Sequence, residues 1–168
     1  MTYPKQFPIH FVTLPMRTYY LKTQQFLPIT MASAWEFFSS PRNLALITPK
    51  CLNFEIIARD EKMFKGQVIH YKITVLPLIR MHWETEITEV IDQQCFTDKQ
   101  RKGPYARWIH KHTFMEVKGG VEMHDELEYA MPFGPLGIFA NFLYVGREVK
   151  TIFDYRFHVL NERFNEAS

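Results

Sequence analysis

Six consecutive segments in the middle of the chain carry β-strand patterns, and no helical segment separates them. Turn residues bound each segment, and β-branched and aromatic side chains are frequent within them, as is typical of strands. The segments are residues 52–58, 67–76, 79–91, 94–102, 108–118 and 121–131. Because parallel strands need long crossover connections, strands joined by such short turns pair antiparallel. The sequence therefore predicts an antiparallel meander.

One further strand precedes the meander, and a long helix follows it. Residues 19–27 form the strand, and two short helices come next. Ser33 is the predicted N-cap of the first, with Glu36 completing a capping box, and Pro41 opens the second. From Pro135 the apolar residues recur at spacings near three and four, the period of a helix. These residues are Leu136, Phe139, Leu143, Val149, Ile152, Phe153, Leu160 and Phe164. We predict an α+β fold in which a curved, seven-stranded antiparallel sheet wraps around this C-terminal helix.

Length and charge favour one domain without a strong electrostatic preference. A chain of 168 residues can bury one hydrophobic core and is short for two. Its 20 basic and 18 acidic residues are interspersed and leave a formal charge of +2, so we expect no nucleic acid partner. No run approaches the roughly 18 apolar residues of a membrane span, and we expect no stable membrane insertion and a cytoplasmic location. Cys51 and Cys95 lack the spacing of a zinc or redox motif.

Aromatic residues make up 15% of the chain. Such an excess suits a cavity lined with rings, and it equally suits a tightly filled core. The positions of the aromatic side chains on the sheet decide between a lined cavity and a filled core.

The turns predict the register of three hairpins, because a hairpin loop fixes which residues face each other. A two-residue turn at Gly119 and Gly120 joins the last two strands. The turn before it is centred on Tyr105, and the one before that lies at Asp92 and Gln93. The predicted inner pairs are Phe114 with Asp125, His112 with Leu127, His110 with Tyr129, Gln100 with His110, Asp98 with His112, Phe96 with Phe114, Thr85 with Gln100 and Ile87 with Asp98. The predicted outer pairs are Lys111 with Glu128 and Thr113 with Glu126.

All three turns place the same set of side chains on the inner face of the sheet. That set is Trp83, Thr85, Ile87, Phe96, Asp98, Gln100, Trp108, His110, His112, Phe114, Met123, Asp125, Leu127 and Tyr129. Its centre is polar, although the inner face of an ordinary sheet is apolar. A buried polar group without a partner costs about 1–3 kcal/mol, so these groups should form a network or contact water or ligand.

An aromatic-rich concavity with converging polar groups is how a protein orients an amphipathic molecule. The predicted ligand-binding residues are Tyr71, Trp83, Thr85, Asp98, Gln100, Trp108, His110, His112, Phe114, Met123, Asp125 and Tyr129. The remaining histidines, outside this face, are expected at the surface. No nucleophile, phosphate loop or cofactor fingerprint is present in the sequence, and we expect no cofactor and no assigned catalytic residue.

Three other interpretations of the polar centre stay open. His110 and His112 form an HxH pair that can chelate a metal, with Asp98 or Asp125 as an oxygen ligand. We expect no metal, because neither cysteine lies nearby and Asp98 opposite His112 is explained equally well as a carboxylate orienting an imidazole. The Asp98 and His112 pair can also act as a general base, with His110, Gln100 or Tyr129 holding a substrate oxygen. Finally, the cluster can simply brace the sheet.

Several stretches of the chain are similar to one known superfamily. They are FLPITMASAWEFFSSPRNLALITP, WETEI, FTDKQRKGPYARWIHKHTF and PFGPLG. With these stretches the chain resembles the START and polyketide-cyclase (SRPBCC) superfamily, whose helix-grip fold is shared with the birch-pollen allergen, and in particular its bacterial ligand-binding branch. The resemblance covers residues 18–168 as one domain and leaves residues 1–17 outside.

The resemblance implies a function as well as a fold. Members bind hydrophobic or amphipathic small molecules (lipid-like, polyketide-like or aromatic) between the sheet and the helix. Some also catalyse cyclase- or dehydratase-like reactions with cavity residues. Some relatives in this branch carry a cell-division-inhibitor label and are associated with an NAD-dependent epimerase-like protein, which the resemblance suggests as a partner.

Overall fold

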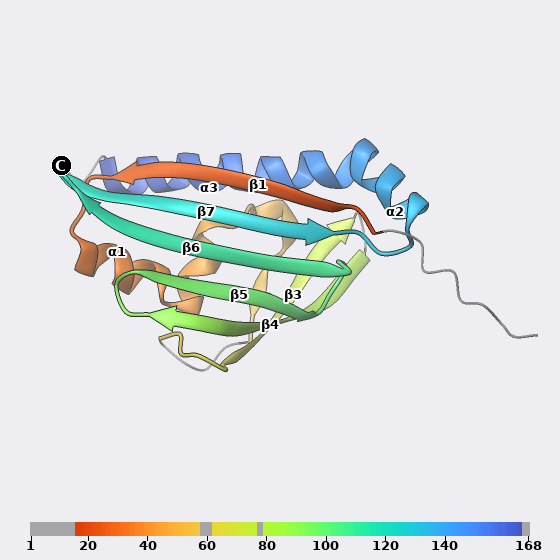
Figure 1. The fold of residues 1–168 in the computed structure, drawn as a ribbon, viewed down its shortest axis with the longest axis horizontal. Helices are drawn as coiled ribbons and strands as arrows, with labels where there is room; N and C mark the ends of the chain where they lie inside the picture. Colours follow the sequence, from red (N-terminus) through yellow and green to blue (C-terminus); the bar gives the residue numbers. More distant parts are fainter. Residues whose placement is uncertain (1–15, 58–61, 77–78, 166–168) are drawn as a thin grey trace, which may run out of the picture.

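The computed structural model describes residues 16–57, 62–76 and 79–165 (Figure 1). The expectations for residues 1–15 and for residue 58 lie outside these ranges. In chain order the elements are β1 (Thr18–Leu27), α1 (Met31–Phe38), the 3₁₀ helices η1 (Pro41–Ile47) and η2 (Lys50–Leu52), β2 (Glu55–Ile56), β3 (Val68–Leu76), β4 (Ile79–Ile91), β5 (Cys95–Lys102), β6 (Arg107–Val117), β7 (Gly120–Ala130), α2 (Pro135–Ala140), the π-helical turn η3 (Asn141–Val145) and α3 (Gly146–Asn165).

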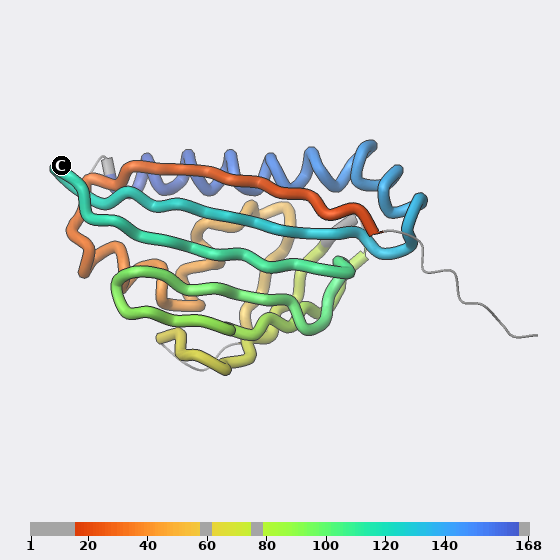
Figure 2. Tube along the Cα trace, viewed as in Figure 1, coloured from red at the N-terminus to blue at the C-terminus, as the bar shows by residue number. Residues whose placement is uncertain are grey.

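Seven antiparallel strands form one sheet in the order β1-β7-β6-β5-β4-β3-β2. The tube in Figure 2 shows β3 to β7 as successive hairpins, with β1 returning to pair with β7. The long helix lies along the sheet beside β1 (Figure 1), where Gln25 Nε2 donates to the carbonyl of Phe157 and to Asn161 Oδ1. The predicted α+β helix-grip architecture is confirmed.

Two apolar clusters attach the helix to the sheet. Near its C-terminal end, Leu160 is fully buried together with Phe37, Phe38 and Phe114. Nearer its start, Val149 and Phe153 are buried against Leu127 and Tyr129. Burying one such side chain contributes about 1.5–3 kcal/mol, so the helix is held at both ends.

Several predicted elements have different limits in the structure. The N-cap of α1 is Thr30 rather than Ser33, because Thr30 Oγ1 accepts a hydrogen bond from the Ser33 backbone N–H at 3.2 Å. The strand predicted for residues 52–58 shrinks to Glu55–Ile56, since residues 50–52 form a 3₁₀ turn that ends at Asn53 with φ +43°. The C-terminal helix begins at Pro135 as predicted, but a π turn interrupts it.

The hairpin between β6 and β7 turns one residue earlier than predicted. Val117 faces Gly120, so that the turn residues are Lys118 and Gly119, and Gly119 has φ +88°. Gly120 is needed for a different reason. A Cβ at this position would lie 2.2 Å from the Leu27 carbonyl oxygen of β1, so only glycine lets the two strands approach this closely. The observed pairs replace the predicted ones: His110 with Leu127, Lys111 with Glu126, His112 with Asp125, Thr113 with His124 and Phe114 with Met123.

Of the other two hairpins, one has a register that differs from the prediction and one has the predicted pairs. Between β5 and β6, Asp98 faces His110 and Phe96 faces His112, two residues away from prediction. The hairpin is centred on Pro104 rather than Tyr105, and the Gln100 side chain bonds both the carbonyl and the N–H of Tyr105 in its loop. Between β4 and β5 the predicted pairs are confirmed: Thr85 with Gln100 and Ile87 with Asp98.

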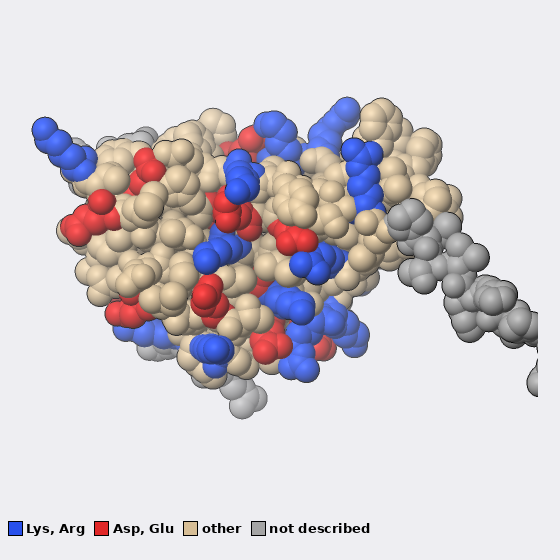
Figure 3. All heavy atoms as spheres, in the orientation of Figure 1, with Lys and Arg blue, Asp and Glu red and all other residues tan. Residues whose placement is uncertain are grey.

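The predicted inner face is confirmed despite these shifts. A register error of two residues keeps every side chain on its own side, because side chains alternate with period two. The outer face carries mixed charges, with blue and red side chains interspersed in Figure 3. The predicted Lys111–Glu128 pair is wrong: Lys111 lies 3.5 Å from Glu89, and Glu128 pairs with Arg107 at 2.6 Å.

Candidate functional site

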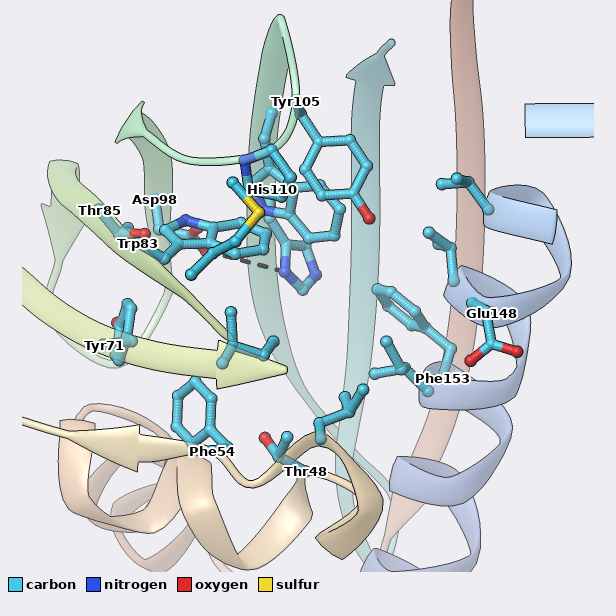
Figure 4. Close-up of a pocket in the computed structure, with 18 of the residues that line it drawn as sticks. Thr48, Phe54, Tyr71, Trp83, Thr85, Asp98, Tyr105, His110, Glu148 and Phe153 are labelled. Atoms are coloured by element: carbon cyan, nitrogen blue, oxygen red, sulfur yellow. Dashed lines mark ion pairs between the residues drawn. The ribbon is translucent and has the colours of Figure 1, made fainter. Parts of the chain in front are cut away.

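A cavity of about 880 Å³ lies between the inner face of the sheet, η1 and the helix α2–α3. Figure 4 shows Trp83, Tyr105 and His110 on the sheet side and Phe153 on the helix side of this space. Rings form much of the wall, with Trp83 and Trp108 in edge-to-face contact at a centroid distance of 5.1 Å. The aromatic residues therefore serve both a lined cavity and the apolar clusters around it.

Seven of the twelve predicted site residues line this cavity. They are Tyr71, Trp83, Thr85, Asp98, Trp108, His110 and His112. The other five predicted site residues are not among the described residues that line the cavity, and the structure gives a reason for each. Phe114 and Met123 are buried in the cluster near α1, and Gln100 bonds the Tyr105 backbone. Tyr129 donates to Asn141 Oδ1 at 2.9 Å, and Asp125 lies behind the two histidines.

The two inward histidines converge on one carboxylate oxygen. His110 Nε2 donates to Asp125 Oδ1 at 3.0 Å. His112 Nδ1 lies 2.6 Å from the same oxygen, an ion-pair contact whose angle falls short of a hydrogen bond. Arg156 Nη1 of α3 approaches that oxygen to 3.5 Å. Asp125 is only 1% exposed, so these three groups provide its electrostatic compensation.

A second carboxylate lies on the cavity side of the same two rings. Asp98 Oδ2 is 3.7 Å from His110 Nδ1 and 3.6 Å from His112 Nε2. The ring centroids of the two histidines are 3.9 Å apart. The imidazoles are therefore enclosed between Asp98, which lines the cavity, and Asp125, which does not.

These contacts push the pKa values of the two histidines in opposite directions. Burial lowers the pKa of His110, and the neighbouring charge of His112 lowers it further. Burial acts in the same direction on His112, but the charge and contact of Asp125, with help from Asp98, outweigh it and raise the pKa. Burial alone would raise the pKa of Asp125, yet His112, His110 and Arg156 together hold it well below its usual range. The cluster thus favours one protonated and one neutral imidazole.

Two further side chains with polar atoms, Trp83 and Tyr71, line the cavity beside this cluster. Trp83 Nε1 is buried without a hydrogen-bond partner among the described residues. Burial, together with the charge of Asp98, raises the pKa of Tyr71, so its phenol stays neutral. A neutral phenol on the cavity wall can donate a hydrogen bond to an oxygen atom of a bound molecule.

Sequence reasoning missed the helix side of the site. Arg156 contacts Asp125 and lines the cavity, and it occupies the same stripe as Val149, Phe153 and Leu160. A charged residue on an apolar stripe was the signal that could have identified it. The role of Asn141 had no comparable signal, because the π turn that holds it is not marked in the sequence.

Comparison with known proteins agrees with this architecture. Residues 27–161 match the family model described as "Polyketide cyclase / dehydrase and lipid transport". No curated protein matches the sequence significantly. Protein Ms6760 from Mycobacterium smegmatis has a similar fold, with TM-score 0.64, 16% identity and coverage of 96% of this chain and 100% of that one. Protein TTHA0849 from Thermus thermophilus also has a similar fold, with TM-score 0.62, 16% identity and coverage of 89% of this chain and 99% of that one.

A plant enzyme shares the fold as well. The norcoclaurine synthase of Thalictrum, solved as a point mutant with a transition-state analogue, has TM-score 0.62 and 11% identity, with coverage of 90% of this chain and 99% of that one. At such identities the likeness concerns the fold alone. Because the family model covers most of the chain, the protein belongs to the polyketide cyclase/dehydrase and lipid transport family. Within the described ranges, no helix combines the length and apolarity needed to cross a bilayer.

Proposed function

We propose that this protein binds a hydrophobic or amphipathic small molecule, lipid-like, polyketide-like or aromatic, in the cavity between the sheet and α3. The observation that carries the proposal is a cavity of about 880 Å³ with rings on its wall and one polar region, formed by Asp98, His110 and His112. Such a wall holds an apolar body by burial and fixes one polar end by hydrogen bonds. The family description, which includes lipid transport, supports the same class of ligand.

The mouth of the cavity supports this proposal independently. Leu136, Phe139 and Leu143 of the α2–η3 segment line the cavity, yet they are 75%, 59% and 54% exposed. Each Å² of apolar surface that a ligand covers contributes about 25 cal/mol. An apolar molecule would therefore gain affinity by extending from the polar region toward this mouth.

A titration of the purified protein with the amphipathic dye 1-anilinonaphthalene-8-sulfonate, followed by displacement with a long-chain fatty acid, tests this function. Ile152→Trp fills the cavity from α3 and should weaken both dye and fatty acid binding by more than about tenfold. Tyr155→Trp adds an indole on the same helix, at a residue that is not among the described lining residues, and should leave binding unchanged. Equal binding by the two variants would show that the probes bind elsewhere.

Acid–base catalysis is a second candidate, and a specific observation favours it. His110 and His112 both line the cavity, and their imidazoles lie between the carboxylates of Asp98 and Asp125. The pKa of His110 is lowered, whereas the pKa of His112 is raised. A general base positioned in this way suits a cyclisation or dehydration without a cofactor. The cytoplasmic location and the epimerase-like partner rest on the sequence and its resemblance alone and stay predictions.

A further inference from the structure

Three metal-binding atoms converge on the cavity wall. Asp98 Oδ2, His110 Nδ1 and His112 Nε2 all lie within 4.8 Å of one another. Both histidines are buried, and Asp98 keeps 17% of its side chain exposed. The strands β5 and β6, paired directly, carry all three residues on one face.

The distances in this group fit metal coordination better than hydrogen bonding. Asp98 Oδ2 lies 3.7 Å from one ring nitrogen and 3.6 Å from the other. Hydrogen bonds between nitrogen and oxygen end at about 3.2 Å. Two ligands of a tetrahedral ion, each bonded at about 2.0–2.2 Å, are about 3.3–3.6 Å apart. The two distances from Asp98 Oδ2 are therefore close to the edge length of a coordination tetrahedron, and the two ring nitrogens lie within 4.8 Å of each other.

On the side of each imidazole ring that faces away from Asp98, the neighbouring groups resemble the second coordination shell of a metal site. Asp125 Oδ1 contacts His110 Nε2 and His112 Nδ1, the nitrogens that point away from Asp98. Because His110 donates from Nε2, its Nδ1 lone pair is directed to the Asp98 side. A carboxylate behind a histidine ligand fixes the tautomer and the ring orientation and raises the basicity of the ligand atom.

Charge supports a cation at this position. Asp98 and Asp125 bring two carboxylates, and among the described residues Arg156 contacts one of them, Asp125. Without a metal the protonated imidazole of His112 balances the second carboxylate. A metal ligand has to be a neutral imidazole, so a bound cation would take over that role, and a buried uncompensated charge would be costly. Asp125 lies between Arg156 and the rings and contacts both, which limits repulsion between the guanidinium and a metal ion.

We propose that Asp98, His110 and His112 bind one first-row divalent transition-metal ion, with Zn²⁺ as the representative, at the cavity wall. Two imidazoles and one carboxylate form a donor set that suits Zn²⁺ and excludes Mg²⁺, which prefers six oxygen ligands. The proposal departs from the sequence-based expectation, in which Asp98 was a hydrogen-bonding partner of His112. A fourth position faces the cavity and would accept a ligand oxygen. That extension rests on the proposed function, whereas metal binding itself does not.

Calorimetric titration of the chelator-treated full-length protein with ZnCl₂ tests the site without any organic ligand. We expect one Zn²⁺ per chain, d–d absorption bands of four-coordinate Co²⁺ when CoCl₂ replaces zinc, and no heat with MgCl₂. Asp98→Asn and His112→Ala should each weaken Zn²⁺ binding more than about tenfold. His124→Ala is the matched control, since His124 lies on β7 and contacts Glu122 outside the cavity.

Because His112→Ala removes a buried ring, thermal unfolding of every variant accompanies the titrations. Asp98→Asn preserves the shape of the side chain and keeps the test valid even where the alanine variant unfolds. Absence of stoichiometric Zn²⁺ binding by the folded wild-type chain would overturn the proposal. So would equal Zn²⁺ affinity in wild type and Asp98→Asn, or an equal loss in His124→Ala.

Discussion

Arg156 of α3 lies 3.5 Å from Asp125 of β7, and this contact joins the helix to the second strand of the sheet. Both residues are buried, at 8% and 1% exposure. The helix therefore delivers a positive charge to the carboxylate that orients His110 and His112. The apolar clusters fix where α3 lies, and the Arg156–Asp125 pair ties its position to the electrostatics of the cavity.

Arg156→Leu should destabilise the fold by about 3 kcal/mol, because removal of one partner leaves the other charge buried and less compensated. Urea unfolding of wild type and variant measures this difference. In a double-mutant cycle with Asp125→Asn, the loss caused by Arg156→Leu should become smaller, since the charge it compensates has gone. Additive losses in the cycle would mean that the two side chains do not interact.

Tyr129→Phe tests the contact between the sheet and the π turn. The Tyr129 hydroxyl donates to the buried Asn141 Oδ1 at 2.9 Å, so the variant leaves that oxygen without its donor. The expected loss is about 1–3 kcal/mol in free energy of unfolding. Tyr19→Phe is the control, because its ring stacks on Tyr129 at 5.3 Å and keeps that contact without the hydroxyl. A similar loss in both variants would assign the effect to the ring environment instead.

Gly120→Ala should disrupt the pairing of β7 with β1. The added Cβ would lie 2.2 Å from the Leu27 carbonyl oxygen, a backbone atom that cannot rotate away. Gly66→Ala separates this clash from backbone strain, since Gly66 has φ +88° and no atom within 4 Å of its Cβ position. We expect about 1–2 kcal/mol for Gly66→Ala and a larger loss for Gly120→Ala, measured by thermal unfolding. A smaller loss at Gly120 would show that β1 can shift outward.

The sequence predicted the inner face of the sheet more accurately than its pairs. Alternation fixes the face, and an error of two residues leaves it unchanged, which is why His110 and His112 were placed inward correctly. The pairs depend on loop details that the sequence does not display. Gln100 closes its loop through its own side chain, and Gly120 is required by β1, a strand far earlier in the chain.

The candidate site was predictable only on its sheet side for a related reason. Strand register can be counted from a turn, whereas the rotation of a helix against a sheet depends on tertiary contacts. The contribution of Arg156 therefore came from the structure. Phe114 and Met123 were predicted to bind ligand because they face inward. In the structure α1 and its neighbours pack against them, and neither residue is among those that line the cavity.

The three tryptophans offer a direct measurement of what enters the cavity. Trp83 and Trp108 line it, whereas Trp35 contacts Phe96 and Phe114 in the cluster near α1. Binding of a fatty acid should change the intrinsic fluorescence, because it alters the surroundings of the two lining indoles. Trp35→Phe should keep most of this change, and Trp83→Phe should lose a large part of it. If Trp35→Phe abolishes the response while Trp83→Phe retains it, the ligand occupies the α1 end of the molecule, and the site proposed at the polar wall is wrong.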